Sequence, residues 1–404
     1  MATAGTMKLA DVEISVRDYE LGLIEKAKAL RPLLERSAAA QEAKGELNQE
    51  VIDALGAMGA LKMCLPRRWG GSCTTAETMV EVAIELAKGD PSTAWVMSII
   101  NSVIWLASRI PPATQRLIFA NGVPRMCAPV FSPTARIEKR GDKYTITGKL
   151  GYGSASHHAE WTIIKISDDS GALYGVAVPM SQMRIERTWR VAGMKATGSD
   201  TLAFEDLVVD KEQVFNLTEL YGGTIDIAKE FKPEMTDYFQ SWPMLRTKML
   251  GVLIGTVEGL LEYVVAQSDR PIVRTKYARR ADSTVFQARL GEAAAKIAFA
   301  HAMTKVMARK LDEIASAGRL LSSSDRAQFR GQTSVISELL VYSVEVLMNL
   351  AGSSGYMENS PAQRYWRDFS VGMRHGIFNQ DINYEVFGAY MLGVELDVVD
   401  PEIL

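Results

Sequence analysis

Residues 135–166, "ARIEKRGDKYTITGKLGYGSASHHAEWTIIKI", lie between two parts of the chain whose apolar residues follow a helical period. Strand-forming residues on both sides of Gly141–Asp142 are typical of two strands joined by a tight turn. A second hairpin follows, with its turn at 168–171, and "TGSDTLAFEDLVVD" (197–210) supplies a further strand. We therefore predict a small β domain over residues 124–230.

Helical periodicity dominates both flanks of this β domain. On the N-terminal side, residues 16–36 place apolar side chains three and four positions apart, and Asp90 followed by Pro91 is a typical helix start. On the C-terminal side, residues 244–267, 283–318 and 326–352 read as three long amphipathic helices. We expect an N-terminal helical domain over 1–123 and a helical bundle over 231–404. The predicted fold class is mainly α with a small central β domain.

Composition excludes several classes of partner. The chain has 404 residues, is 47% hydrophobic and has a formal net charge of -3, so neither nucleic acid nor an anionic membrane is expected to bind it. Cys64, Cys73 and Cys127 lack the spacing of metal ligands, which predicts reduced thiols in a cytoplasmic protein and no metal. The apolar stretch 94–107 is too short to span a bilayer.

The turn "GYGSAS" (151–156) admits several interpretations. A dinucleotide-binding fingerprint would be followed by a helix, whereas a strand-like run follows here. A zinc site is disfavoured because the adjacent His157 and His158 have no cysteine nearby in sequence. A serine-hydrolase elbow, G-x-S-x-G, does not occur. A polar surface turn and a functional histidine site both stay open.

Three stretches together resemble the acyl-CoA dehydrogenase fold. They are "LPRRWGGSCTTAETMVEVAIELAKGDPSTAWVMS" (65–98), "RVAGMKATGSDTLAFEDLVVD" (190–210) and "LAGSSGYMENSPAQRYWRD" (350–368). The resemblance implies an N-terminal helical domain, a β-barrel-like middle domain and a C-terminal four-helix bundle. Within that fold the chain is most similar to the reduced-flavin-dependent, two-component (group D) monooxygenases.

The resemblance also implies which residues contact the flavin. Tyr152, Ser154, Ser156, His158 and Trp161 stand where that branch has its flavin-facing turn, although Gly153 and Ala155 depart from its pattern. The further flavin contacts implied are Ser132, then Arg270 and Gln287 for the flavin tail of an adjacent subunit, and Gly352, Ser353, Ser354 and Gly355 for its phosphates.

The C-terminal region distinguishes an oxygenase from a dehydrogenase. Common acyl-CoA dehydrogenases carry a catalytic glutamate shortly after the Arg-Asp pair, but here that place reads Arg374-His375-Gly376. A neutral imidazole accepts a phenol or ammonium proton at neutral pH. The resemblance thus implies His375 as base, His158 as an orienting group, and Ser154 as a contact to flavin N5 or O4. The competing interpretations are a helix cap for His375 and a solvated loop position for His158.

The implied reaction uses externally reduced flavin, FAD rather than FMN, and O2. A C4a-hydroperoxide would hydroxylate an aromatic or N-oxygenate an amine, with phenols, indoles, polyketide aromatics and amino sugars all open. No nicotinamide-binding fingerprint occurs, so a separate NAD(P)H:flavin reductase is expected. The resemblance implies a homotetramer. The alternatives are an acyl-CoA dehydrogenase or oxidase, with Glu258 or Glu262 as base, and a non-catalytic flavin- or ligand-binding protein.

Overall fold

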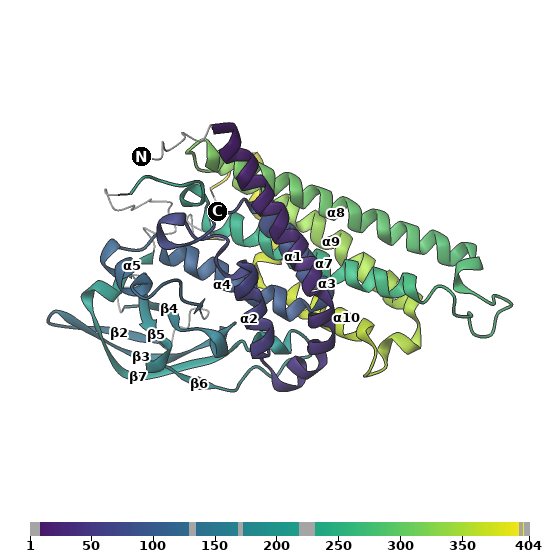
Figure 1. Cartoon of the computed structure of the whole chain (residues 1–404), viewed down its shortest axis with the longest axis horizontal. Helices are drawn as coiled ribbons and strands as arrows, with labels where there is room; N and C mark the ends of the chain where they lie inside the picture. The colour runs from purple at the N-terminus through teal and green to yellow at the C-terminus, as the bar shows by residue number, and fades with distance from the viewer. Residues whose placement is uncertain (1–8, 129–134, 169–172, 218–230, 396–398, 400–404) are drawn as a thin grey trace, which may run out of the picture.

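The structure is a computed structural model that describes residues 9–128, 135–168, 173–217, 231–395 and 399. Helices, then a β sheet, then helices follow one another along the chain, which confirms the predicted order (Figure 1). The sheet lies at one end of the molecule, and the bundle extends away from it (Figure 1).

The N-terminal part of the chain is helical as predicted. Its helices are α1 (Leu9–Lys44), α2 (Gln49–Met58), α3 (Ala76–Gly89), α4 (Pro91–Ala107) and α5 (Pro112–Phe119). Helix α4 begins at the expected Asp90–Pro91 start, and α1 is longer than the predicted stretch 16–36. The side chain of Asp90 accepts a hydrogen bond from the backbone N–H of Thr93, and Pro91 occupies the first turn of α4. An N-cap of this kind satisfies a backbone donor that has no partner inside the helix.

Eight described strands form a single sheet. They are β1 (Met126–Cys127), β2 (Arg136–Arg140), β3 (Lys143–Gly153), β4 (Trp161–Ser167), β5 (Leu173–Pro179), β6 (Arg184–Glu186), β7 (Asp200–Asp210) and β8 (Val214–Asn216). Their order is β6-β7-β3-β2-β4-β5-β8, with β1 on β4. Ile137 pairs with Ile146 across the predicted hairpin at Gly141. Within the described strands β6 and β8 are the two ends of this order, and each pairs with one neighbour.

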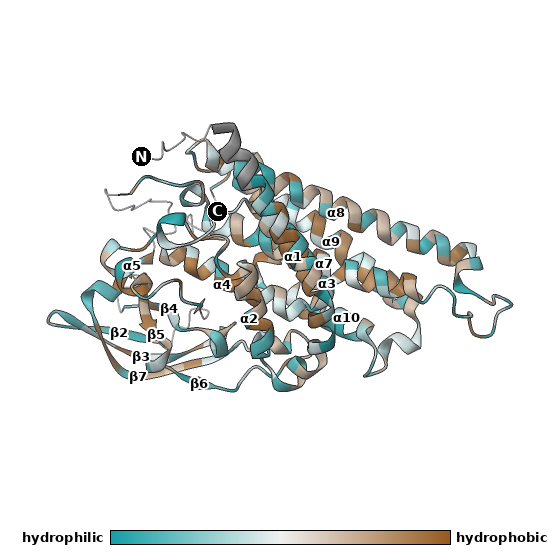
Figure 2. Cartoon of the chain, viewed as in Figure 1, coloured by the Kyte–Doolittle hydropathy of each residue, from teal (hydrophilic) through white to brown (hydrophobic). Residues whose placement is uncertain are grey.

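The C-terminal helices form the predicted bundle. They are α7 (Ser241–Ala266), α8 (Thr284–Ser316), α9 (Ser323–Ala351), α10 (Pro361–Gly372) and α11 (Gln380–Leu392). A Cβ atom at Gly255 of α7 would lie 2.2 Å from the carbonyl oxygen of Ile84 on α3, so only glycine permits this close helix contact. Hydrophobic residues are concentrated where the N-terminal helices meet α7 (Figure 2).

Two described helices are long and apolar enough to cross a membrane, namely α7 and α9. The sequence had pointed only to residues 94–107 as an apolar stretch to weigh for this role. In the fold, 67% of the most apolar part of α7 and 56% of that of α9 are buried. Burial of this extent is typical of core helices in a bundle, and it explains the apolar composition without a membrane.

Candidate functional site

The turn between β3 and β4 holds the predicted flavin-facing residues. Tyr152 and Ala155 adopt left-handed φ angles of 58° and 69°, which reverse the chain sharply before the short helix Ser156–His158. Tyr152 is 63% exposed, and its ring makes an edge contact with Trp189 at 5.7 Å between centroids. Ser154 and Ser156 are buried. The turn therefore exposes one aromatic ring and turns two hydroxyl groups inward.

The two serines bind the start of β7. Ser154 Oγ lies 2.6 Å from Ser199 Oγ, which in turn lies 2.7 Å from Thr197 Oγ1. Ser156 Oγ donates to the carbonyl oxygen of Gly198 at 2.9 Å. From the sequence, residues 197–210 were predicted only to form a strand. The available signal was that Thr197 and Ser199, both hydroxyl residues, flank Gly198 and are followed by an acidic residue.

The two adjacent histidines have different partners. His157 Nε2 lies 2.6 Å from Asp200 Oδ2, and its Nδ1 lies 3.3 Å from Glu46 Oε2, so His157 ties the turn to β7 and to the N-terminal helices. His158 Nε2 is buried and has no hydrogen-bond partner among the described residues. Burial lowers the pKa of His158 to about 4, so its imidazole is neutral at physiological pH.

His375 follows α10 and begins the short helix Gly376–Phe378. Its Nδ1 accepts a hydrogen bond from the backbone N–H of Ile377 at 3.3 Å, so His375 is an N-cap there rather than a cap at a helix C-terminus. Burial, together with the positive charges of Lys165 and Arg246, lowers its pKa to about 4. The ring lies 5.8 Å from that of Trp95 on α4.

Met194 lies between these two turns. Thr197 Oγ1 donates to the Met194 carbonyl oxygen at 2.8 Å. On the other side, a Cβ atom at Gly372 would lie 3.0 Å from Met194 Cε and 3.3 Å from Trp95 Cζ3. A continuous set of contacts therefore joins the Ser154 turn to the end of α10, three residues before His375. The structure brings these two predicted regions together.

Helix α7 carries two buried cations, one of which contacts the turn after His375. Arg246 is 2% exposed and donates from Nε to the carbonyl oxygen of Ile377 at 3.5 Å. Lys248 is also 2% exposed and donates to Ser102 Oγ on α4 at 2.8 Å. Burial lowers the pKa of Arg246 to about 9 and that of Lys248 to about 8. Within the described ranges neither forms an ion pair with a carboxylate.

Sequence analysis missed both cations. The signal was present as two basic residues in the otherwise apolar run "MLRTKMLGVLIG" (244–255). A basic residue on a buried helix face is rare unless it is paired or meets a ligand.

The predicted contacts to the flavin tail lie elsewhere. Arg270 and Gln287 are exposed, and Gln287 Nε2 donates to the carbonyl oxygen of Ala281 at 2.6 Å. Arg280 links this loop to the end of α9 through the Ala351 carbonyl oxygen at 3.2 Å. The α7–α8 loop and the segment from Gly352 to Gly355 lie at the end of the bundle away from the sheet (Figure 1). Within one chain these residues do not meet Ser154. Ser132 lies outside the described residues.

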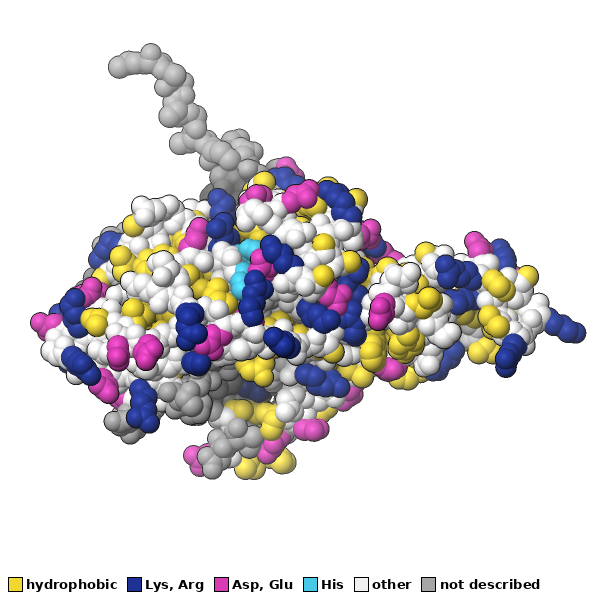
Figure 3. Space-filling model, turned by 90° about the horizontal axis from the view of Figure 1, so that it is seen from below, with side chains coloured by type: hydrophobic (Ala, Val, Ile, Leu, Met, Phe, Trp, Pro, Cys, Tyr) yellow, Lys and Arg dark blue, Asp and Glu magenta, His cyan; other side chains and the backbone are white. Residues whose placement is uncertain are grey.

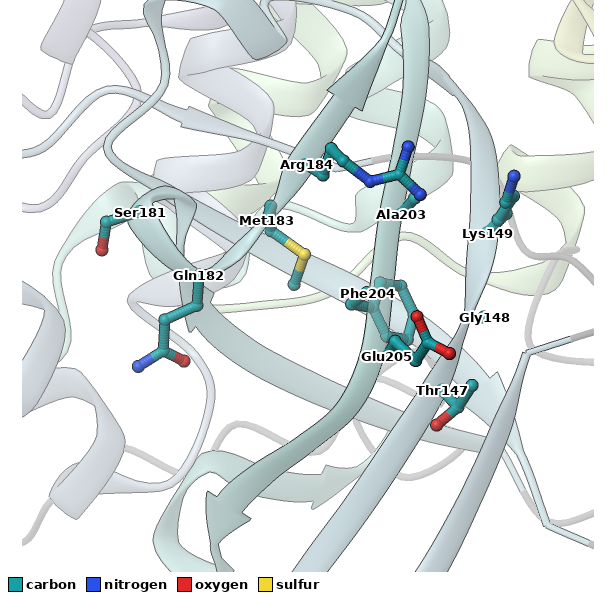
Figure 4. A pocket seen from close by; sticks show the side chains of 10 residues that line it. All are labelled: Thr147, Gly148, Lys149, Ser181, Gln182, Met183, Arg184, Ala203, Phe204 and Glu205. Atoms are coloured by element: carbon teal, nitrogen blue, oxygen red, sulfur yellow. The ribbon is translucent and has the colours of Figure 1, made fainter.

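Two surface hollows lie apart from this region. One, of about 630 Å³, is lined by β3, β6, β7 and residues 181–183 (Figure 4). The other, of about 470 Å³, runs between α7 and α8 beside His301. His301 bonds Glu258 at 2.8 Å and Glu81 at 3.2 Å, and these hydrogen bonds raise its pKa to about 9. Neither hollow is lined by a residue predicted to bind flavin, and the second is lined by Glu258 and Glu262, the candidate bases of the alternative dehydrogenase.

The carboxylates considered for a dehydrogenase are engaged in ion pairs. Glu258 contacts both His301 and Lys88, and although burial opposes ionisation, these partners hold its pKa below the usual range. Glu262 pairs with Arg31. Twelve residues separate Glu258 from Arg246, about 18 Å along the helix axis. This arrangement disfavours Glu258 as a base beside the His375 turn.

Comparison with known proteins places this geometry in a family. The models for the "Acyl-CoA dehydrogenase, N-terminal domain" and "Acyl-CoA dehydrogenase, C-terminal domain" match residues 27–116 and 246–380. The oxygenase component of the FADH(2)-dependent resorcinol hydroxylase of Rhizobium sp. is 25% identical over 92% of this chain and 94% of its own.

Two further similarities extend over most of the chain. The flavin-dependent monooxygenase oxygenase subunit HsaA of Mycobacterium tuberculosis is 25% identical over 90% of this chain and 94% of its own. The structure of XiaF from Streptomyces sp. in complex with FADH2 and glycerol has a TM-score of 0.89, 25% identity, and coverage of 96% and 100% of the two chains.

The residues present suit reduced flavin. His158 Nε2 and Ser98 Oγ are buried polar atoms without a hydrogen-bond partner in the described part of the chain, and buried groups of this kind usually meet a ligand or water. The left-handed turn at Tyr152–Ala155 provides a surface aromatic ring beside the buried Ser154 hydroxyl. Ser154, Tyr152 and His158 are the residues of this turn that would hold a flavin ring.

Proposed function

Because the chain belongs to the acyl-CoA dehydrogenase fold superfamily, among the oxygenase components of two-component flavin-dependent monooxygenases, we propose that it hydroxylates a small phenolic or carboxylate-bearing aromatic compound. The observation that carries this proposal is the neutral imidazole of His375 beside Trp95, where a dehydrogenase has a carboxylate. Reduced flavin, when bound, supplies the electrons that activate O2.

The protein's own contribution begins with flavin placement. Ser154 and Tyr152 would hold the flavin ring. Arg270, Gln287 and the turn from Gly352 to Gly355 would bind the tail of a flavin held by a neighbouring copy. FAD is favoured over FMN because Arg270 and Gln287 are exposed, and their loop lies too far along the bundle to reach the same ring.

His375 moves the substrate proton. Its low pKa keeps the ring neutral, so a lone pair is available at neutral pH. With Nδ1 accepting from Ile377, the resting ring carries its proton on Nε2. The lone pair that can accept the substrate proton is therefore on Nδ1, and its use requires release of this 3.3 Å bond, which costs about 1 kcal/mol. The variant His375→Asn keeps an acceptor for Ile377 and is expected to lose at least about 100-fold in product formation while retaining flavin binding.

Arg246 recognises the negative charge of the substrate. It is buried and has no carboxylate partner among the described residues. Its charge, like that of Lys165, lowers the pKa of His375. A phenolate or carboxylate placed here would neutralise a buried charge, which is favourable in a site with little water. We expect Arg246→Met to weaken binding of a hydroxybenzoate at least tenfold and binding of indole by less than twofold, as measured by equilibrium titration.

Partners and location follow from the two-component organisation. An oxygenase subunit implies a separate flavin reductase, and we propose that it uses NAD(P)H and that both proteins are cytoplasmic. Apolar side chains gather on the narrow arm formed by the bundle (Figure 3), and α8 exposes Phe299 by 53% and Val306 by 52%. We propose a homotetramer that covers such residues, and analytical ultracentrifugation of the wild type measures its size.

The central experiment supplies reduced flavin without any reductase. Protein, anaerobically reduced FAD or FMN, and isotopically labelled O2 are mixed with a panel of phenols, indoles, aromatic acids and amino sugars. We expect one labelled oxygen atom in an aromatic product, detected by mass spectrometry, and none without protein. Labelled amino-sugar products would instead favour N-oxygenation. Unlabelled products, or dehydrogenation of acyl thioesters, would overturn the proposal.

A further inference from the structure

The hydroxyl groups of Ser154, Ser199 and Thr197 form a row that ends on the backbone carbonyl of Met194. The oxygen–oxygen distances along this hydroxyl row are 2.6, 2.7 and 2.8 Å. The three side chains are 9%, 4% and 2% exposed, in that order. Because water has little access, the hydrogen atoms of the row have to be shared among its own members.

The direction of hydrogen-bond donation along the hydroxyl row is fixed at the end that meets Met194. A carbonyl oxygen only accepts, so Thr197 donates its single hydroxyl hydrogen to Met194. Ser199 must then donate to Thr197, and Ser154 must donate to Ser199. As a result Ser154 Oγ has no hydrogen left to offer a ligand. It faces any bound molecule with lone pairs alone, as an acceptor.

The Met194 peptide groups, where the row ends, are held by further hydrogen bonds. The Met194 carbonyl also accepts from Trp189 Nε1 at 2.9 Å, and the Met194 N–H donates to the buried Asp368 carboxylate at 2.5 Å. If Ser154 turned its hydrogen outward, two oxygen atoms in the row would face each other with no hydrogen between them. An outward turn of the Ser154 hydroxyl hydrogen thus breaks one buried hydrogen bond, which is unfavourable.

We propose that the hydroxyl row makes Ser154 a fixed acceptor that selects reduced over oxidised flavin, with Ser199 and Thr197 as positioning residues. This inference rests on the proposed function. Reduced flavin carries an N–H group at N5, whereas oxidised flavin presents a lone pair at the same atom. Flavin O4 has only lone pairs in either state. The row therefore assigns Ser154 to N5 and removes the O4 alternative expected from sequence.

The test compares affinities for the two redox states. Dissociation constants for FAD and FMN are measured by fluorescence titration, and those for the anaerobically reduced forms by equilibrium dialysis. The wild type is expected to prefer the reduced form. In Ser199→Ala and Thr197→Val that preference should fall about tenfold, which lowers the midpoint potential of bound flavin by about 30 mV.

Matched variants distinguish loss of the hydroxyl row from a general loss of stability. Thr197→Ser keeps the hydroxyl group and should keep the preference, whereas Thr197→Val keeps the shape and should lose it. Thr201→Val removes a different hydroxyl pair, with Thr188 at 2.7 Å, and should leave the preference unchanged. Thermal unfolding confirms that each variant is folded.

Two results would overturn the inference. One is a wild type that binds reduced and oxidised flavin equally. The other is an unchanged preference in both folded variants, Ser199→Ala and Thr197→Val. A wild type that binds neither redox state contradicts the proposed function itself, and the inference with it, so the two failures are distinguishable.

Discussion

At the scale of single residues, His375 and His301 take opposite charge states for identifiable reasons. His375 is buried beside Trp95 with positive charges nearby, and its pKa falls to about 4. His301 lies between two carboxylates, and its pKa rises to about 9. Burial without a negative partner favours the neutral ring, and two hydrogen-bonded carboxylates favour the charged ring. Only neutral His375 is suited to accept a proton at neutral pH.

The lowered pKa values of the two buried histidines, His158 and His375, predict how stability depends on pH. In the unfolded chain His158 and His375 titrate near 6.5, whereas in the folded protein they titrate near 4. Between these values the unfolded state binds more protons, so the free energy of unfolding decreases as pH falls from about 6.5 to about 4. Each histidine contributes up to about 3 kcal/mol to this loss.

Urea unfolding at pH 4, 5, 6 and 7 measures the effect. His375→Asn, which keeps an acceptor for the Ile377 N–H group, should show a shallower decline than the wild type. His158→Asn should do the same, and the double variant should be the flattest. An equally steep decline in the double variant would show that other groups control acid sensitivity.

At the scale of elements, the segment between η5 (Lys195–Thr197) and β7 packs against the Ser154 turn. Gly198 has a φ of 53°, and a Cβ atom there would lie 2.6 Å from His157 Cδ2. Its carbonyl oxygen accepts from Ser156 Oγ. Glycine is therefore needed both for the backbone angle and for the contact with the imidazole.

We predict that Gly198→Ala destabilises the protein by about 2–3 kcal/mol, because it adds a steric clash to the cost of a left-handed backbone angle. Gly141→Ala is the matched control, since Gly141 has a φ of 65° but no atom within 4 Å of an added Cβ. That variant should lose only about 1 kcal/mol. Equal losses in chemical denaturation would contradict the predicted clash with His157.

The ion pairs between α3, α7 and α8 give a second prediction at this scale. Glu258 and Glu81 raise the pKa of His301, so their stabilisation is present below about pH 6.5 and is lost as pH rises through about 9. Glu258→Gln should reduce the decline in melting temperature between pH 7 and pH 9.5. Glu262→Gln, on the same helix but paired with Arg31, should leave that decline unchanged.

At the scale of the whole molecule, the residues predicted to bind flavin lie at the two ends of the long bundle. Ser154, Met194 and His375 lie where the sheet meets α4 and α10. The α7–α8 loop and the segment from Gly352 to Gly355 lie at the far end (Figure 1). A single chain cannot bring these groups to one flavin. The division is therefore consistent with the proposed oligomer, in which one copy binds the ring and another the tail.

This arrangement predicts a selective effect on FAD. The variants Arg270→Ala and Gln287→Ala should weaken binding of reduced FAD about tenfold, because they remove polar contacts to its adenine-bearing tail. Reduced FMN, which lacks that tail, should bind as in the wild type. Anaerobic titration measures both constants. Equal weakening for the two flavins would indicate that these residues act on assembly rather than on the tail.

The sequence by itself determined the helix–sheet–helix order, the N-cap of α4, and the absence of a carboxylate at Arg374-His375-Gly376. These properties depend on local periodicity, on capping residues and on the order of a few motifs, all of which are written along the chain. Sequence also singled out the turn at Ser154.

Only the tertiary structure decided which groups face that turn and in what state they are held. Ser199 and Thr197 reach Ser154 because β7 pairs with β3, and Arg246 meets the His375 turn because α7 packs against it. The neutrality of His375 and the fixed direction of the hydroxyl row depend on burial and on partners that are distant in sequence. Such effects arise only when the chain has excluded water from its interior, so no local pattern can specify them.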